Sequence, residues 1–201
     1  SGFLREEEAQ RYWIERGIGQ DLGNESTLSA VYDQESLDDQ GDNVRAGTRW
    51  AVRMNRETEG RFTDRVWLGF HTNAYDPGTL GLFNNEARFP DTGTPNQIAY
   101  AHIVAEEVQG DMLLIGSPPL ENPWPDRGDN LIFEHPSYPY GEINDLTIGG
   151  EFDATIVEVL AHGNPNEAEI VRDPKARNWI ARAAYQAVVE YFDQFGAGDP
   201  T

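Results

Sequence analysis

The sequence of 201 residues contains no cysteine. A chain without thiols has no disulfide framework, no thiolate zinc site and no cysteine nucleophile, so metal ligands or nucleophiles must be residues of another type. The sequence also lacks any apolar run near the ~18 residues that a membrane-spanning helix needs. We therefore expect a protein without a membrane span.

Basic residues are scarce. Fifteen Lys plus Arg stand against 35 Asp plus Glu, for a formal net charge of −20, and Lys175 is the only lysine. A field of this sign repels phosphate backbones, so we expect no nucleic-acid partner. The acids are spread along the chain, which is typical of a solvated surface. An arginine-biased genome and adaptation to salt both fit this charge.

The apolar content is that of an ordinary globular protein. Hydrophobic residues make up 38% of the chain and aromatic residues 11%, including five Trp. A chain of this length builds one sizeable core and is short for two. We expect residues 1–201 to form a single domain.

Strand and helix patterns alternate along the chain, which indicates one α/β domain. Gly17 is expected to end the first helix, and Asp173 with Pro174 forms a helix start with an N-cap and a proline at the first position. A proline-rich loop at 117–142 is long enough to be functional or to cover another part of the domain. The predicted helices are residues 4–17, 43–57, 96–109 and 172–195, and the predicted strands are 28–32, 65–73, 80–85 and 153–164.

Two ionisable residues lie in strands that have apolar residues on both faces, the mark of interior strands. His71 follows the apolar run of "RVWLGFHTN", and Glu158 lies within "DATIVEVLAHGN". Burying a carboxylate costs several kcal/mol unless it is paired or neutralised. Ligands of open α/β sheets bind beyond the carboxyl ends of the strands. A zinc site built from His and carboxylate, with His162 nearby and a second Glu as base for the metal-bound water, is the economical explanation.

Structural explanations compete with that hypothesis. His71 alone is compatible with a packed histidine that makes one hydrogen bond, and Glu158 with a structural ion pair to Arg88 or Arg127. The specific zinc motif HExxH is absent. Two further histidines are expected to be structural, His102 as a packed or surface residue of a helix and His135 as a surface residue of the proline-rich loop.

Two segments resemble a known family. "VWLGFHTNAYDPGTLGLF" (66–83) is similar to the second metal-ligand segment of zinc-dependent N-acetylmuramoyl-L-alanine amidases of the amidase_3 type. "ATIVEVLAHGNPNEAEIVRDPKARNWIARAAYQAVVEYF" (154–192) resembles the ending of that family, with a strand that bears a Glu and a "DP" before the last helix. The "YGE" element at 140–142 is similar to the golvesin or xanthan-lyase-associated branch.

The resemblance implies a single mixed or mainly parallel sheet flanked by helices. It implies a zinc ligand at His71, a catalytic carboxylate at Glu158 and one zinc ion, with His162 as the nearest substitute ligand. Glu158 would take a proton from water and stabilise the tetrahedral intermediate, and Asn73 would shape the turn after the strand. The implied substrate is peptidoglycan, cleaved between muramic acid and L-alanine, which places the protein outside the cell, in the periplasm or at the cell wall.

The sequence departs from the family pattern at its beginning. The other two zinc ligands of the family, a His in a Gly-His-Gly-like turn and a Glu, precede the segment of His71, and no His occurs in residues 1–70. We expect the first strand and its ligands to lie upstream or on a second chain that completes the site.

Two other functions fit the residues. One is a non-catalytic wall- or glycan-binding domain, or a structural subunit of an extracellular assembly with a degenerate metal site, in which Trp124, Tyr138 and Tyr140 stack on sugars. The other is a zinc hydrolase that acts on a different amide or on a polysaccharide, because family likeness defines site chemistry better than substrate.

Overall fold

The computed structural model describes residues 9–21, 29–34, 37–54 and 61–196. Its elements are the helices α1 (Gln10–Asp21), α2 (Ser29–Tyr32), α3 (Asp39–Met54), α4 (Gln97–Ile115), α5 (Asp145–Ile148), α6 (Pro165–Arg172) and α7 (Pro174–Phe195), the 3-10 helix η3 (Phe62–Asp64), and the strands β1 (Val66–Asn73), β2 (Thr79–Leu82), β3 (Ile132–Phe133) and β4 (Asp153–Ala161). Among these helices, none is both long and apolar enough to cross a membrane.

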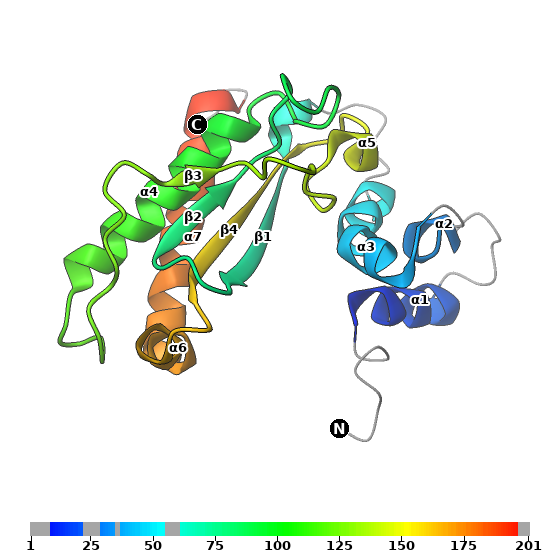
Figure 1. Ribbon diagram of the computed structural model, residues 1–201. Coiled ribbons are helices and arrows are strands. Elements are labelled where there is room, and N and C mark those ends of the chain that lie inside the picture. Colours follow the sequence, from blue (N-terminus) through cyan, green and yellow to red (C-terminus); the bar gives the residue numbers. More distant parts are fainter. Residues whose placement is uncertain (1–8, 22–28, 35–36, 55–60, 197–201) are drawn as a thin grey trace.

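The four strands form one mixed sheet in the order β1-β4-β2-β3. β1 runs parallel to β4, β4 antiparallel to β2, and β2 parallel to β3. Helices α4 and α7 cover one face, and α5 with the end of α3 packs on the other (Figure 1). The predicted α/β sheet flanked by helices is confirmed.

β4 is the central strand and divides the core in two. Successive side chains of a strand point to opposite faces. Val157 and Val159 pack toward α4 and α7, whereas Ala154 and Ile156 pack toward α5 and α3. By the same alternation, Glu158 points to the side of Ile156, at the end where the apolar packing on that face stops.

The prediction of β1 as an interior strand is wrong. Among the residues that the structure describes, β1 pairs only with β4 and forms an edge of the sheet. Its apolar residues lie on both faces but are mostly half-buried, and Phe70 is 51% exposed. The run of apolar side chains in β1 occurs because both faces of the strand are partly covered, not because a neighbouring strand lies on each side of it. β4 is interior, as predicted.

The N-terminal third differs most from the sequence-based expectation. Residues 29–32 form α2, not a strand, because Val31 packs between α1 and α3 beside Ile14 and Trp50. α1 continues past Gly17 to Asp21, and the predicted residues 4–8 lie outside the described part of the chain.

The remaining helix boundaries have local causes. α3 begins four residues before the predicted start because Asp38 caps it, accepting from the backbone N–H of Gly41 at 2.8 Å. Residues 55–57 of the prediction lie outside the described part. α4 runs on to Ile115 rather than ending at 109. The predicted cap of the last helix is confirmed, since Asp173 accepts from Lys175 N at 2.8 Å, but a separate helix α6 precedes it.

The proline-rich loop contains β3 and covers two parts of the domain. Trp124 is only 4% exposed and belongs to the core beneath α4 and α7, so the expectation that it stacks on a sugar is wrong. The other end of the loop, residues 138–142, lines a cleft together with Ile156 and Glu158 of β4.

Gly81 sets how closely α4 packs on the sheet. A Cβ at this position of β2 would lie 2.1 Å from the carbonyl oxygen of Ala101 in α4. Backbone on both sides leaves no flexible side chain that could move away. The contact between helix and sheet therefore requires a residue without a side chain.

We expect Gly81→Ala to lower the free energy of unfolding by about 2 kcal/mol, because α4 must shift away from β2. Urea unfolding followed by circular dichroism measures this. Gly110→Ala is the matched control on α4, where a Cβ meets no described atom within 4 Å, and it should stabilise by up to about 1 kcal/mol through helix propensity. Equal effects of the two variants would contradict the account.

Candidate functional site

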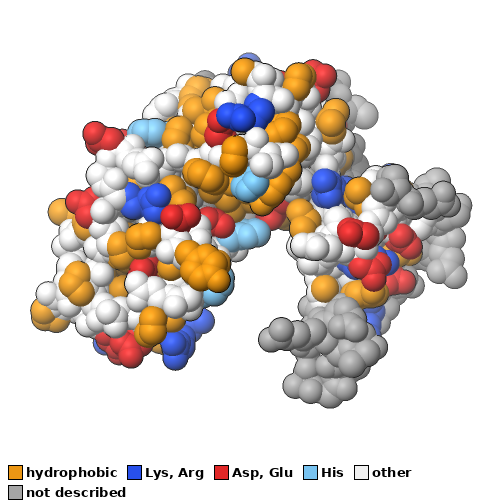
Figure 2. Space-filling view, viewed as in Figure 1, with side chains coloured by type: hydrophobic (Ala, Val, Ile, Leu, Met, Phe, Trp, Pro, Cys, Tyr) orange, Lys and Arg blue, Asp and Glu red, His pale blue; other side chains and the backbone are white. Residues whose placement is uncertain are grey.

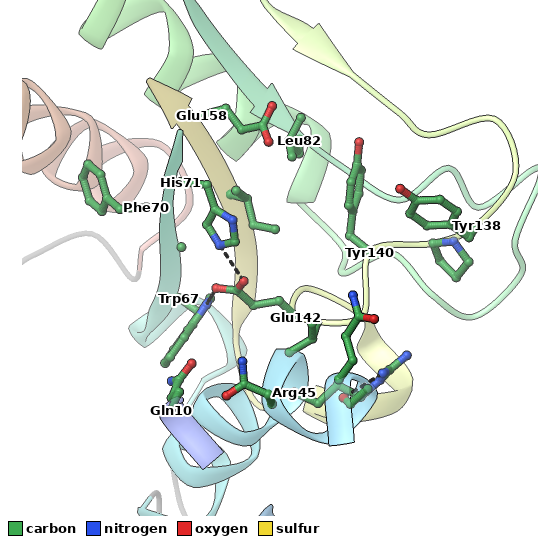
Figure 3. A pocket seen from close by; sticks show the side chains of 18 of the residues that line it. Gln10, Arg45, Trp67, Phe70, His71, Leu82, Tyr138, Tyr140, Glu142 and Glu158 are labelled. Atoms are coloured by element: carbon green, nitrogen blue, oxygen red, sulfur yellow. Dashed lines mark hydrogen bonds and ion pairs between the residues drawn. The ribbon is translucent and has the colours of Figure 1, made fainter. Parts of the chain in front are cut away.

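The parallel pairing of β1 with β4 brings two of the predicted site residues together. The register places His71 directly opposite Glu158. Side chains at paired positions of neighbouring strands project from the same face, so the imidazole and the carboxylate open into one cleft (Figure 3). Their position at the carboxyl ends of parallel strands is where open α/β sheets bind ligands.

A second carboxylate, Glu142, contacts the imidazole. His71 Nε2 lies 2.8 Å from Glu142 Oε2, and the indole N–H of Trp67 donates to Glu142 Oε1 at 3.1 Å. Because a carboxylate only accepts hydrogen bonds, Nε2 carries the proton in this contact. Sequence reasoning noted Glu142 only within the "YGE" element and did not predict it as a site residue.

Two residues on other elements make room for Glu142 and hold it. A Cβ at position 69 would lie 2.4 Å from Glu142 Oε1, so Gly69 leaves the space on β1 that the carboxylate occupies. Thr48 of α3 donates its hydroxyl to the backbone carbonyl of Glu142 at 2.7 Å. The glycine in the middle of the strand pattern was the one local signal that something approaches β1 closely.

The loop that carries Glu142 is attached to the end of β2 through buried Asn84. The Asn84 side chain accepts from Tyr140 N at 2.6 Å and donates to Tyr140 O at 3.1 Å. It also donates to the carbonyls of Thr92 at 3.1 Å and Ile143 at 3.4 Å. One buried amide thus fixes the backbone on both sides of residues 141 and 142.

Glu158 is half-buried and is held by an amide rather than by an arginine. Asn73 Nδ2 donates to Glu158 Oε2 at 2.5 Å. The same Asn73 shapes the following turn, since its Oδ1 accepts from the backbone N–H groups of Tyr75 and Asp76 at 2.9 and 3.0 Å. The predicted role of Asn73 in that turn is confirmed, and the residue also orients the carboxylate.

The surroundings raise the pKa values of both paired residues. Burial raises the pKa of Glu158 above its ordinary value, and the hydrogen bond from Asn73 and the nearby imidazole oppose this only in part. The hydrogen bond to Glu142 raises the pKa of His71, while partial burial of the ring opposes it. A carboxylate with a raised pKa is a better proton acceptor than an ordinary one.

The cleft has a volume of about 730 Å³. β1 and β4 form one wall, and residues 138–142 with helix α3 form the other; Gln10 of α1 lies at one end (Figure 3). Figure 2 shows the molecule hollowed between the part built on the sheet and the part built from α1 to α3. The space is large enough for a sugar or peptide unit of a polymer.

The other histidines do not join His71. His162 is exposed and its Nδ1 lies 3.0 Å from the Thr72 hydroxyl, on the residue that follows His71 and points to the other face. His102 contacts Glu106 on the exposed side of α4, and His135 stacks on Tyr138. The role of His162 as a metal ligand stays a prediction.

The structural explanations for the two residues fit less well. Arg88 pairs with Glu134, and Arg127 donates to the carbonyls of Pro77 and Asn130, so neither arginine is the partner of Glu158. The His71 side chain is 45% exposed rather than packed in the core.

The described residues include side chains of the kinds that bind zinc, but too few of them lie together to complete a site. Imidazole and carboxylate are ligands that zinc prefers, and His71 and Glu142 already converge. However, no group of three or more His, Asp or Glu side chains that could hold a metal occurs among the residues that the structure describes. A catalytic zinc site takes three protein ligands. The described part of the chain by itself is therefore one donor short.

The sequence matches no protein-family model and no curated protein. The fold is similar to that of an N-acetylmuramyl-L-alanine amidase from Mycobacterium abscessus, with 14% identity, a TM-score of 0.49, and coverage of 72% of this chain and 61% of that chain. It is also similar to the CwlD amidase from Clostridioides difficile, solved in complex with the GerS lipoprotein, with 10% identity, a TM-score of 0.48, and coverage of 81% and 70%. The chain thus spans about 61% of the length of the first. We assign no residue role and no activity from these likenesses.

The contact between His71 and Glu142 has a measurable signature. A raised pKa means that the ion pair stabilises the fold below the ordinary pKa of histidine and that this contribution is lost as the pH rises through the folded-state pKa. We expect the His71 ring signals in NMR to titrate above ~6.5, and Glu142→Gln to lower the midpoint. Glu106→Gln removes a similar contact, that of His102 on α4, and should leave the His71 midpoint in place. A midpoint that Glu142→Gln does not move would contradict the pairing.

Proposed function

We propose that the chain is an amide hydrolase of the N-acetylmuramoyl-L-alanine amidase type. Its substrate would be peptidoglycan, and the bond cleaved would join the lactyl group of muramic acid to the first L-alanine. The observation that carries the proposal is that His71, Glu142 and Glu158 lie in one cleft. His71 and Glu158 belong to two paired strands whose sequences resemble that family. An activity on peptidoglycan places the protein outside the cell, in the periplasm or at the cell wall.

Glu158 is the proton carrier in this proposal. Asn73 holds Oε2, while Oε1 makes no hydrogen bond within the described residues, and Glu158 lines the cleft. The carboxylate takes a proton from the attacking water and then delivers it to the nitrogen of the leaving L-alanine. Its burial, which raises its pKa, favours both transfers, because the group binds and releases a proton nearer to neutral pH.

His71 and Glu142 are the donors that would hold a zinc ion. Zinc, when bound, supplies a Lewis acid that polarises the amide carbonyl and acidifies water. Ligation through His71 Nε2 requires the loss of the proton that this atom now shares with Glu142, so binding should weaken at low pH. The third donor would come from a residue outside the described part, on an upstream segment or a second chain.

A non-catalytic glycan-binding domain is the second candidate. It is favoured because no group of three or more potential metal ligands occurs among the described residues, and because exposed Tyr138 lies on the cleft. Such a domain would bind glycan without cleaving it and would not depend on Glu158. A hydrolase for another amide or polysaccharide differs from the first proposal only in the product it releases.

We expect Glu158→Gln to reduce the release of L-alanine-linked peptides from purified peptidoglycan at least about a hundredfold, because the amide cannot accept the proton. Released peptides are separated by liquid chromatography and identified by mass spectrometry. Glu106→Gln on α4, remote from the cleft, is the control and should keep full activity. Activity that survives in Glu158→Gln would argue against the amidase, and so would the absence of activity from wild-type protein supplied with zinc and with the segment or chain that completes the site.

Zinc content is tested independently of activity. Elemental analysis of protein prepared with the segment or chain that completes the site, and dialysed with zinc, should give about one ion per chain, as a catalytic site of this type requires. His71→Ala should lose most of this metal, and His102→Ala should keep it. Zinc that remains in His71→Ala would show that His71 is not a ligand, and a completed wild-type site without zinc would contradict the metal site.

A further inference from the structure

Three aromatic rings gather in the last part of the proline-rich loop. The rings of His135 and Tyr138 stack with centroids 3.6 Å apart and planes inclined by 23°. Tyr140 meets Tyr138 edge-on, at 6.2 Å and 84°. Tyr138 is 52% exposed although one of its faces lies against His135. The exposed surface of the ring is therefore mainly its other face and its edge.

The loop holds this arrangement from several sides. Arg88 donates to the carbonyl of Pro136 and to Glu134 Oε1, both at 3.2 Å. The backbone N–H of Ser137 donates to His135 Nδ1 at 3.2 Å, and Asn84 fixes the backbone of Tyr140. A ring fixed in this way loses little conformational entropy when a ligand covers it.

The rings belong to the same cleft as the predicted catalytic carboxylate. Tyr138, Pro139 and Tyr140 line it together with Glu158. Figure 3 shows Tyr140 between Glu158 and Tyr138, so that Tyr138 lies at the outer end of the row. A polymer bound with one bond at Glu158 would place a neighbouring unit over Tyr138.

The side chains that line the cleft favour an uncharged ligand with hydroxyl groups, such as a sugar ring. A pyranose has an apolar face of C–H groups, which packs on an aromatic face, and a rim of hydroxyls that need hydrogen-bond partners. Side-chain amides of Gln40 and Asn43 and the carboxylates of Asp38 and Glu142 line the same cleft and supply such partners. With Glu158, these carboxylates outnumber the one arginine among the described residues of the cleft, Arg45, and in a chain of net charge −20 they oppose an anionic ligand.

We propose that the exposed face of Tyr138 is a sugar subsite, on which a pyranose of a glycan strand stacks while the neighbouring unit lies at Glu158. The subsite extends the proposed amidase cleft and rests on that function for its place in catalysis, but sugar binding itself needs no hydrolysis. Tyr138 would then determine how strongly the glycan part of the substrate is held.

The test measures binding without turnover. Full-length Glu158→Gln protein is titrated with a tetramer of β-1,4-linked N-acetylglucosamine, which carries the sugar and no peptide, and binding is followed by calorimetry. We expect saturable binding that weakens about tenfold when Tyr138→Ala is added and persists when Tyr138→Phe is added, because phenylalanine keeps the aromatic face. Tyr185→Ala is the matched control, a 70% exposed tyrosine of α7 that does not line the cleft.

A second measurement requires no substitution at Tyr138. In NMR spectra of the Glu158→Gln protein, Tyr138 ring protons should shift on titration and show contacts to the axial C–H groups of the sugar. This readout decides the question if Tyr138→Ala fails to fold. Absence of saturable binding, an unchanged affinity in folded Tyr138→Ala, or shifts confined to other residues would overturn the subsite. If the wild-type protein hydrolyses peptidoglycan despite any of these results, the subsite is wrong and the proposed amidase function still holds.

Discussion

The parallel pairing of β1 with β4 is the constraint on which the candidate site depends. Its register sets His71 opposite Glu158, and a slip of one residue would turn one of the two side chains to the opposite face of the sheet. The central position of β4 secures this register, because Val157 and Ile156 are buried in separate clusters on its two faces. Packing energy that is unrelated to catalysis thereby aligns the two ionisable groups at the rim.

The site also shows how buried charge is accommodated in a strongly acidic chain. Glu158 is oriented by the amide of Asn73, and Glu142 by the imidazole of His71 and the indole of Trp67. An arginine beside Glu158 would stabilise the carboxylate anion and lower its pKa. The neutral amide of Asn73 instead fixes the position of the carboxylate and leaves its pKa raised. This choice of partner suits the proposed role of Glu158, which gains and loses a proton.

Sequence reasoning succeeded where local pattern decides structure. The apolar runs of β1 and β4 and the cap at Asp173 with Pro174 were predictable from neighbouring residues alone, and so was the placing of His71 and Glu158 at strand ends. It failed where distant packing decides, as in α2, whose short apolar segment folds against two other helices. Glu142 escaped prediction because its contact with His71 spans 71 residues of chain and depends on the space left by Gly69.

In the proposed reaction, water directed by Glu158 attacks the amide between the lactyl group and L-alanine. Digestion of peptidoglycan in water enriched in oxygen-18, followed by mass spectrometry of both products, tests it most directly. We expect one labelled oxygen in the lactyl carboxylate of the glycan product and none in the released peptide, which leaves as an amine. Label at an anomeric carbon or in a peptide carboxylate would show that a different bond is cleaved and would contradict the account.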